Sequence, residues 1–230
     1  MEKFYFNPLS LTQQTREYFP NLQTLFIYYS NDNHFETDKR IIKREPIIKK
    51  YNLCIDQVIQ LEKWTQLKCG EIVFDSEKDN WNKTSSIFNE RIIGKEKLMF
   101  IIQEDEKDEI FGCFINTEII DHFYAWISTD LKSFLFNIQS NGRLPSMMKF
   151  DIINTKYGYL LTKPTDDLLI NIGNIRLYKH DTLIESSSWQ NESNFNYYGI
   201  ENALCGKKQN EYGKIFFYPK RIIIIQMNCL

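Results

Sequence analysis

The chain has 230 residues, of which 43% are hydrophobic and 15% are aromatic, with 28 Lys and Arg against 30 Asp and Glu. This apolar content is enough to build a packed core, so the composition excludes an intrinsically disordered chain. The formal net charge of −2 excludes a globally basic nucleic-acid binder and a polyanionic tail, although a local charged patch is still allowed.

The cysteines and the hydropathy pattern bear on the compartment in which the chain folds. Its five cysteines are Cys54, Cys69, Cys113, Cys205 and Cys229. They are odd in number and far apart, whereas a secreted disulfide framework or a zinc module would show paired spacings. No segment approaches the roughly 18 consecutive apolar residues of a membrane span. We therefore expect no membrane span, no cofactor and no bound metal, and a cytoplasmic or nuclear location.

The first third of the chain has helical periodicity. Leu22, Leu25, Phe26 and Tyr29 recur at i, i+3, i+4 and i+7, which places them on one face of a short helix. A second helical segment, Asp56–Trp64, follows after Pro46, which ends one turn and can open the next. We predict a helical N-terminal extension over residues 1–63, followed by a second domain over residues 64–230.

From about Lys68 the pattern becomes that of short strands. The predicted strands are Glu71–Phe74, Leu98–Ile102, Ile110–Ile115, Phe134–Ile138, Met148–Ile152, Leu168–Ile172, Ile175–Tyr178, Lys214–Tyr218 and Arg221–Met227. Turn residues separate several of them, as at Ser140–Gly142 and Gly173-Asn174. With one helix predicted among them, Thr117–Tyr124, these strands favour an α+β fold: a mostly antiparallel two-sheet β-sandwich with flanking helices. We expect Phe100, Phe111, Phe134, Phe136 and Phe150 to lie in its core.

The second domain also carries a series of short motifs in a characteristic order. They are Trp64, Glu71–Ser76, Phe88, Ile93–Lys95, Leu98–Ile102, Ile110–Ile115, Asp130, Ser133–Phe136, Ser140–Arg143, Phe150, Gly173–Leu177, Leu204–Lys207 and Ile222–Gln226. In this order and spacing the segment from Trp64 to Asn228 resembles the TLDc domain family, which includes the oxidation-resistance proteins. Cys113 departs from the second glycine that many members place after the Phe-Gly pair.

The resemblance implies a two-sheet sandwich and a protein-binding role in stress response. It also implies a protein partner, and relatives of this kind are associated with the vacuolar proton-pumping ATPase. It brings no accepted catalytic mechanism. The glycines agree, because none of them belongs to a phosphate-binding motif.

Few residues form a pattern that suggests catalysis. His34, His122 and His180 are far apart, with no acid or cysteine at metal-ligand spacing. Cys205 stands in the sequence Leu204–Lys207, where the lysine could lower its thiol pKa, so one alternative is a thiol hydrolase centred on Cys205. The competing interpretation is a small buried residue in a turn.

Two charged segments remain. Glu104–Glu109 is an acidic connection between two apolar strands, typical of a solvated hairpin tip or of a docking site. Basic residues before the second domain could contact DNA phosphates from one helix face, with aromatic residues at Phe195–Tyr198 as a second stacking candidate. The basic residues are Lys39, Arg40, Lys43, Arg44, Lys49 and Lys50.

The sequence therefore predicts a non-enzymatic interaction or regulatory protein, stress-linked, that acts through surfaces of the sandwich. The first alternative is a DNA-binding transcriptional regulator that uses the basic helices. The second is the thiol hydrolase centred on Cys205.

Overall fold

The computed structural model describes residues 50–106, 108–205 and 214–229. The described residues all belong to the second of the two units into which the chain divides, Glu45–Leu230. The helix predicted around Leu22–Tyr29 and most of the basic segment lie outside the described residues. The domain boundary predicted between residues 63 and 64 falls inside the second unit.

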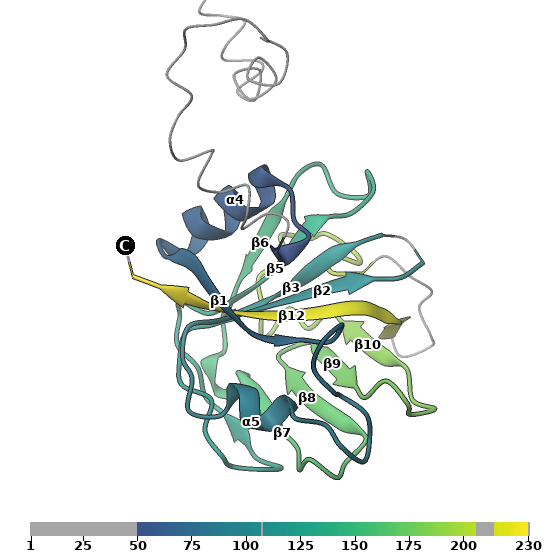
Figure 1. Cartoon of the computed structure of the whole chain (residues 1–230). Helices are drawn as coiled ribbons and strands as arrows, with labels where there is room; N and C mark the ends of the chain where they lie inside the picture. Colours follow the sequence, from purple (N-terminus) through teal and green to yellow (C-terminus); the bar gives the residue numbers. More distant parts are fainter. Residues whose placement is uncertain (1–49, 107, 206–213, 230) are drawn as a thin grey trace, which may run out of the picture. The chain divides into compact units, whose positions relative to one another are not determined.

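Two antiparallel sheets make up the described part of the chain, which confirms the predicted α+β sandwich (Figure 1). Sheet A has the order β1-β12-β2-β3-β5-β6. Its strands are β1 (Lys68–Asp75), β2 (Leu98–Glu104), β3 (Ile110–Ile115), β5 (Phe134–Gln139), β6 (Met148–Asp151) and β12 (Pro219–Asn228). Long apolar strands occupy the middle of this sheet, where both neighbours satisfy their backbone hydrogen bonds.

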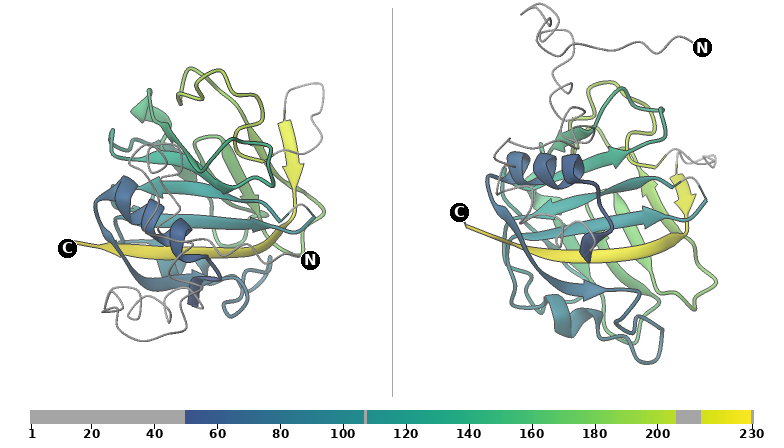
Figure 2. Two further views of the ribbon diagram at one scale, coloured as in Figure 1. Left: turned by 90° about the horizontal axis from the view of Figure 1, so that it is seen from above. Right: turned by 45° about the horizontal axis from the view of Figure 1, so that its top comes forward.

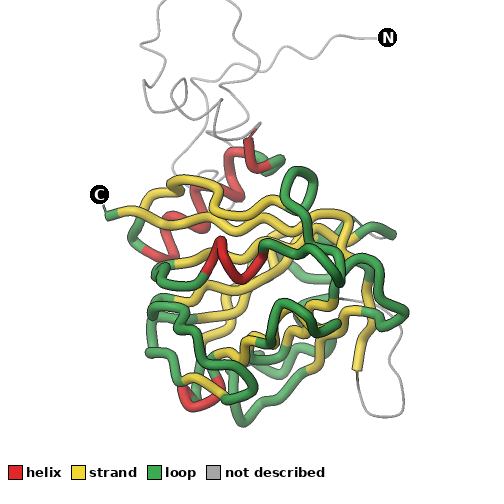
Figure 3. The backbone as a smooth tube through the Cα atoms, turned by 60° about the horizontal axis from the view of Figure 1, so that its bottom comes forward, coloured by secondary structure: helices red, strands yellow, loops and turns green. Residues whose placement is uncertain are grey.

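Sheet B is built from shorter strands in the order β11-β10-β9-β8-β7-β4. They are β4 (Trp126–Ile127), β7 (Tyr159–Leu161), β8 (Leu168–Ile172), β9 (Ile175–Tyr178), β10 (Ser186–Trp189) and β11 (Lys214–Phe217). The chain passes from β11 to β12, and so from sheet B to sheet A, through the single residue Tyr218. Strands are the main regular elements of both layers, and loops connect them (Figure 3).

The main core lies between the two sheets. Phe100, Phe111 and Phe150 of sheet A point into it and meet Ile170, Leu177 and Phe217 of sheet B. Phe111 and Phe217 make an edge-to-face contact with ring centroids 5.0 Å apart. Because side chains alternate along a strand, the neighbours of these sheet A residues must point to the opposite face.

A helix covers that opposite face. The α4 helix (Ile55–Thr65) confirms the helix predicted over Asp56–Trp64 and lies against sheet A (Figure 2). Its Val58 and Leu61 are buried there. They pack with the outward residues of sheet A, among them Met99, Ile101, Phe134, Phe136 and Ile225. Sheet A is therefore buried on both faces, which explains the uninterrupted apolar run of Leu98–Ile102.

The five phenylalanines predicted in the core are all buried, which confirms that prediction. The turn at Ser140–Gly142 is also confirmed, since the Arg143 amide donates to the Ser140 carbonyl and both central residues have positive φ.

The helix predicted over Thr117–Tyr124 is wrong. This segment is an irregular loop whose backbone groups bond to other elements: Ile119 exchanges hydrogen bonds with Gly94 and Lys95, and the Tyr159 hydroxyl accepts from the Ile120 amide. Tertiary partners thus replace the i→i−4 ladder. A short helix forms earlier instead, α5 (Phe88–Ile92), whose Phe88 packs edge-to-face on Phe74 with centroids 5.1 Å apart.

Three strands were not predicted: β4, β7 and β10. They have two to four residues each, too few to show a period, and β10 is largely serine. A single 3-10 turn, η2 (Thr155–Tyr157), precedes β7. No helix among the described residues is long and apolar enough to cross a membrane.

Candidate functional site

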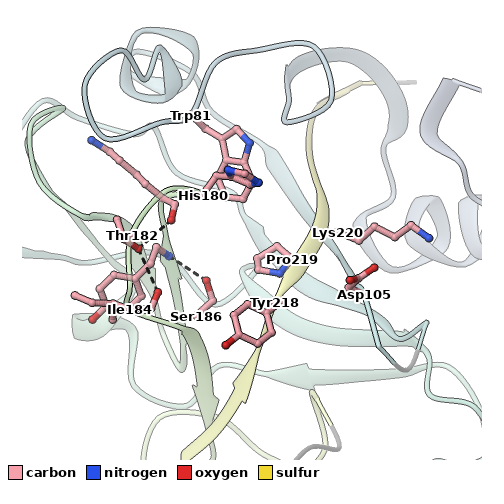
Figure 4. A pocket seen from close by; sticks show the side chains of 11 residues that line it. Trp81, Asp105, His180, Thr182, Ile184, Ser186, Tyr218, Pro219 and Lys220 are labelled. Atoms are coloured by element: carbon pink, nitrogen blue, oxygen red, sulfur yellow. Dashed lines mark hydrogen bonds between the residues drawn. The ribbon is translucent and has the colours of Figure 1, made fainter.

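A cleft opens where four segments that are far apart in sequence come together. These are the loop that follows β1, the connection from β2 to β3, the connection from β9 to β10, and the passage from β11 to β12. The cleft has a volume of about 450 Å³. Its lining residues are Trp81, Asp105, Tyr178, Lys179, His180, Thr182, Ile184, Ser186, Tyr218, Pro219 and Lys220, and we call it the Trp81–Tyr218 cleft (Figure 4).

A second hollow of about 420 Å³ lies beside the first and shares Trp81, His180 and Lys220 with it. The remaining lining residues of this hollow come from the loop Ser76–Asn82. The shared tryptophan and histidine therefore stand between two adjoining depressions.

An ion pair holds in place the loop after β1, which forms one side of the cleft. The Asp75 carboxylate, at the end of β1, accepts from the Arg221 guanidinium at 2.9 Å and 2.8 Å, and both side chains are buried. Burial opposes ionisation of Asp75, but the hydrogen bonds and charge of Arg221 outweigh it, so the pKa of Asp75 lies below its ordinary value. This two-pronged contact ties the loop after β1 to the start of β12, next to Lys220.

A buried lysine holds in place the β9–β10 connection, which forms another side of the cleft. The Lys179 ammonium donates to the backbone carbonyls of Lys83 and Pro164, so its charge points away from the cleft. Burial lowers the pKa of Lys179, and the carboxylates of Asp166 and Asp167 partly offset that effect. Lys179 thereby joins the β9–β10 connection to two other loops.

Aromatic rings form much of the cleft surface. The His180 ring packs edge-on against the buried Trp81 ring, with centroids 5.3 Å apart. Tyr218 lies on the opposite side of the cleft, with Ser186 and Pro219 between the two rings (Figure 4). The Ser186 hydroxyl accepts from the Tyr178 amide at 3.1 Å.

Exposed apolar side chains stand at the margin of the cleft. Leu183, at the tip of the β9–β10 connection, is fully exposed, and its neighbour Ile184 is 47% exposed. Tyr218 is 51% exposed. Scattered apolar residues are normal on a surface, but three large ones beside a depression are typical of a binding site.

The acidic segment Glu104–Glu109 contributes to the same margin through Asp105, whose amide donates to the Tyr218 carbonyl at 3.1 Å. The segment is only partly a solvated tip, because Glu104 and Glu109 are buried. Glu109 is paired there with Arg143 at 3.1 Å.

The predicted thiol lies elsewhere. Cys205 is fully buried in the core between the sheets, so its side chain has no surface from which to attack a substrate. The position supports the interpretation of a small packed residue over that of a nucleophile. Burial likewise raises the pKa of the Cys113 thiol, which disfavours its reactive form.

Of the basic residues predicted to contact DNA, the structure describes only Lys50, which is exposed with its amine 5.5 Å from the centre of the Tyr51 ring. The other five lie outside the described residues. The aromatic residues at Phe195–Tyr198 were predicted to stack on nucleic-acid bases. Of these, Phe195 and Tyr197 are buried, and only Tyr198 is exposed to a ligand.

The histidines are not brought together. His34 lies outside the described residues, and His122 and His180 are both exposed. No group of three or more His, Cys, Asp or Glu side chains within the described ranges could hold a metal ion.

The chain matches no known protein-family description, and no curated protein matches it. The TLDc resemblance therefore stays a prediction.

Sequence reasoning missed the cleft as a site. It treated His180 as an isolated histidine and did not single out Trp81, Leu183 or Tyr218. One signal was present in the sequence: Leu183-Ile184 is an apolar pair inside a polar connection, where turn residues are expected.

Proposed function

We propose that the chain is a non-enzymatic interaction protein, regulatory and stress-linked, whose TLDc-like domain binds a protein partner through the Trp81–Tyr218 cleft. The observation that carries this proposal is the group of exposed apolar side chains at the margin of an open depression. Aromatic and aliphatic residues around a pocket are the usual anchors of protein recognition.

The polar groups around the cleft favour binding over catalysis. Asp75 is held by Arg221, and the Lys179 amine is held by two backbone carbonyls. A general base or nucleophile needs a free face toward a substrate, whereas these charges hold the walls of the cleft in place. The cleft is thus built as a rigid receptor, which limits the entropy lost when a partner binds.

The family resemblance suggests where to look for the partner. Because relatives of this kind are associated with the vacuolar proton-pumping ATPase, that assembly is the first partner to test. The loop positions of Leu183 and Tyr218 suit such a role, since binding residues are often carried on loops held by a rigid scaffold.

Quantitative co-purification from the native cell tests the proposal. The tagged full chain is compared with a double variant of the cleft margin, Leu183→Ser with Tyr218→Ala. The matched control is Leu131→Ser with Tyr198→Ala, which changes a leucine and a tyrosine that are 74% and 54% exposed elsewhere on the domain.

We expect mass spectrometry to find at least one protein that the wild type and the control retain in equal amounts and that the cleft variant loses about tenfold or more, the size of effect typical of an interface anchor. Subunits of the proton-pumping ATPase are the first to be compared. If the cleft variant retains every protein that the control retains, the proposal fails.

A further inference from the structure

The outer face of sheet B, unlike that of sheet A, is not covered by a helix of the described part of the chain. Both described α-helices, α4 and α5, pack against β1 of sheet A. In sheet B, directly opposite residues form one row across all six strands, which lie side by side (Figure 1). The row consists of Trp126, Leu160, Asn171, Arg176, Ser187 and Phe216, and together with Trp189 we call it the Arg176 face.

The row points away from the core. Ile175 and Leu177, the two neighbours of Arg176 in its strand, are buried between the sheets. Because side chains alternate along a strand, Arg176 and the residues opposite it face outward. The larger side chains of this face are all partly exposed: Trp126, Leu160, Arg176, Trp189 and Phe216.

We propose that the Arg176 face binds an extended segment of a partner protein in which one carboxylate lies between apolar side chains. This surface goes beyond the proposed function, which concerns the Trp81–Tyr218 cleft. The strands of sheet B, as the structure describes them, contain two charged residues, Arg176 and Lys214, and both are basic. A face rich in Trp, Phe and Arg and without Asp or Glu has the composition of the centre of a protein interface.

Arg176 supplies the charge that the partner meets. The centre of its guanidinium lies 5.1 Å from the centre of the Trp189 ring, a cation–π contact that limits its orientations. Within the described ranges the guanidinium has no carboxylate partner. Its planar fork of donors matches the two oxygens of a carboxylate, so an acidic side chain of the partner completes the pair.

Asn171 supplies a second polar contact. It stands directly opposite Arg176 on the neighbouring strand, which puts their β-carbons about 4.5–5.5 Å apart. The Asn171 side chain is only 3% exposed, yet its carbonyl oxygen makes no hydrogen bond with a described residue. A buried acceptor without a donor costs stability, and a backbone N–H of the partner that donates to it removes that cost.

Charge complementarity disfavours two other occupants of the face. A second copy of the chain, related by two-fold symmetry, would bring Arg176 against the same cationic face with no acid to pair with. Single-stranded nucleic acid is bound in grooves whose positive charge follows the backbone, whereas these strands provide only Arg176 and Lys214. One carboxylate among apolar groups matches one guanidinium among aromatic rings.

Selection from a random peptide library tests the inference with the full chain. Six strands span about 24 Å, which about eight extended residues cover, so displayed peptides of about 12 residues are long enough. The library is first depleted on the Arg176→Glu variant and then selected on the wild type. Peptides that bind at the Trp81–Tyr218 cleft bind both proteins and are removed in the first step. We expect the retained peptides to share an Asp or Glu flanked by aromatic or aliphatic residues.

A synthetic peptide of the selected sequence then gives the affinities. Arg176→Glu and Trp126→Ala should each weaken its binding about tenfold or more, as loss of an anchor does, and Lys132→Glu should not. Lys132 is the matched control because its reversal makes the same change of charge at an exposed residue. Replacing the acid of the peptide by Lys should abolish binding to the wild type and restore binding to Arg176→Glu.

Asn171→Val separates recognition from folding. It should weaken the peptide about two- to tenfold, the worth of one hydrogen bond, while its melting temperature stays at or above that of the wild type, because it removes a buried acceptor that has no donor. A melting temperature clearly below that of the wild type would assign the amide to the fold and contradict its role in binding. The amide spectrum of each variant reports whether its fold is intact.

The inference is overturned if no peptide distinguishes the wild type from Arg176→Glu, if the selected peptides carry no acid, or if a folded Trp126→Ala variant keeps full affinity. Two other results would identify a different occupant. A thymidine oligonucleotide that binds at low salt and is lost on Arg176→Glu would indicate nucleic acid. A dimer in sedimentation that Arg176→Glu dissociates would indicate a second copy.

Discussion

At the scale of single residues, the pair formed by Asp75 and Arg221 holds the structure around the cleft. It joins the end of β1 to the start of β12, strands separated by 146 positions in sequence, and Glu77 adds a contact to the same guanidinium at 3.2 Å. The pair is buried, so each charge depends on the other for compensation.

Asp75→Asn should therefore lower the free energy of unfolding by about 3 kcal/mol at neutral pH, the lower end for a broken buried pair, because it leaves the buried Arg221 charge with only the exposed Glu77 carboxylate as an ionic partner. The effect should depend on pH. Because the folded state lowers the pKa of Asp75, its contribution is fully present above the ordinary aspartate pKa of about 3.9 and is lost as the pH falls through the folded-state value.

Denaturant unfolding of both proteins from pH 7 to pH 3 checks this expectation. The difference between wild type and variant should be constant above about pH 5 and should shrink below about pH 4. Asp151→Asn serves as the control, since the Asp151–Lys149 pair is largely exposed and should contribute less than about 1 kcal/mol. An Asp75→Asn difference as large at pH 3 as at pH 7 would show that the carboxylate charge is not responsible.

Gly112 is a second residue on which the sheet depends. A β-carbon built at this position in β3 would lie 1.9 Å from the Phe100 carbonyl oxygen of the neighbouring strand, which is backbone and cannot turn away. Gly142, by contrast, has open space around it and only its φ of +81° opposes a side chain.

We expect Gly112→Ala to cost at least about 3 kcal/mol, at the upper end of overpacking, and Gly142→Ala about 1–2 kcal/mol. Thermal unfolding of the two variants gives the comparison. Equal melting temperatures would mean that β2 and β3 can separate without loss, contrary to the packing described.

At the scale of elements, the sequence predicted strands best where the apolar segment was long enough to show a pattern. The strands Ile110–Ile115, Leu168–Ile172 and Ile175–Tyr178 are found with the predicted bounds, because polar or turn residues flank each apolar run, with Gly173-Asn174 between the last two. The failure at Thr117–Tyr124 has the opposite cause. Asn116 and Thr117 at its start are N-cap residue types, but the hydrogen bonds offered by Gly94, Lys95 and Tyr159 outweigh its local helical preference.

Most of the α4 helix precedes the predicted domain boundary, yet the helix packs on sheet A. Its inward residue Leu61 is fully buried against sheet A, whereas Ile59 is 41% exposed on the other side of the same helix. A helix that covers one face of the sheet is part of the sandwich rather than of a preceding extension.

Leu61→Ala should lower the free energy of unfolding by about 2–5 kcal/mol, since it removes a side chain from a closed core. The matched change Ile59→Ala should cost less than about 1 kcal/mol. Both are measured by denaturant unfolding monitored by tryptophan fluorescence, to which Trp64 beside Phe134 contributes. A Leu61→Ala variant as stable as Ile59→Ala would detach the helix from the domain.

At the scale of the whole molecule, the fold class followed from the sequence but the candidate site did not. Strand patterns record which residues face a core, and that information is local. The cleft depends on where loops more than 90 residues apart meet: the Lys83 carbonyl accepts from Lys179, 96 positions away. Sequence patterns along the chain do not show which distant loops come into contact, so the contact between Trp81 and His180 could not be predicted from them.

The central claim is that the Trp81–Tyr218 cleft is the surface by which the chain meets its partner. The most direct test is site-specific photo-crosslinking in the native cell, with p-benzoylphenylalanine placed at Leu183 and, as control, at the exposed Leu131. The account predicts that position 183 gives a discrete crosslinked protein, that the Tyr218→Ala change suppresses it, and that position 131 gives none. Crosslinks of equal yield from both positions, or from position 131 alone, would contradict it.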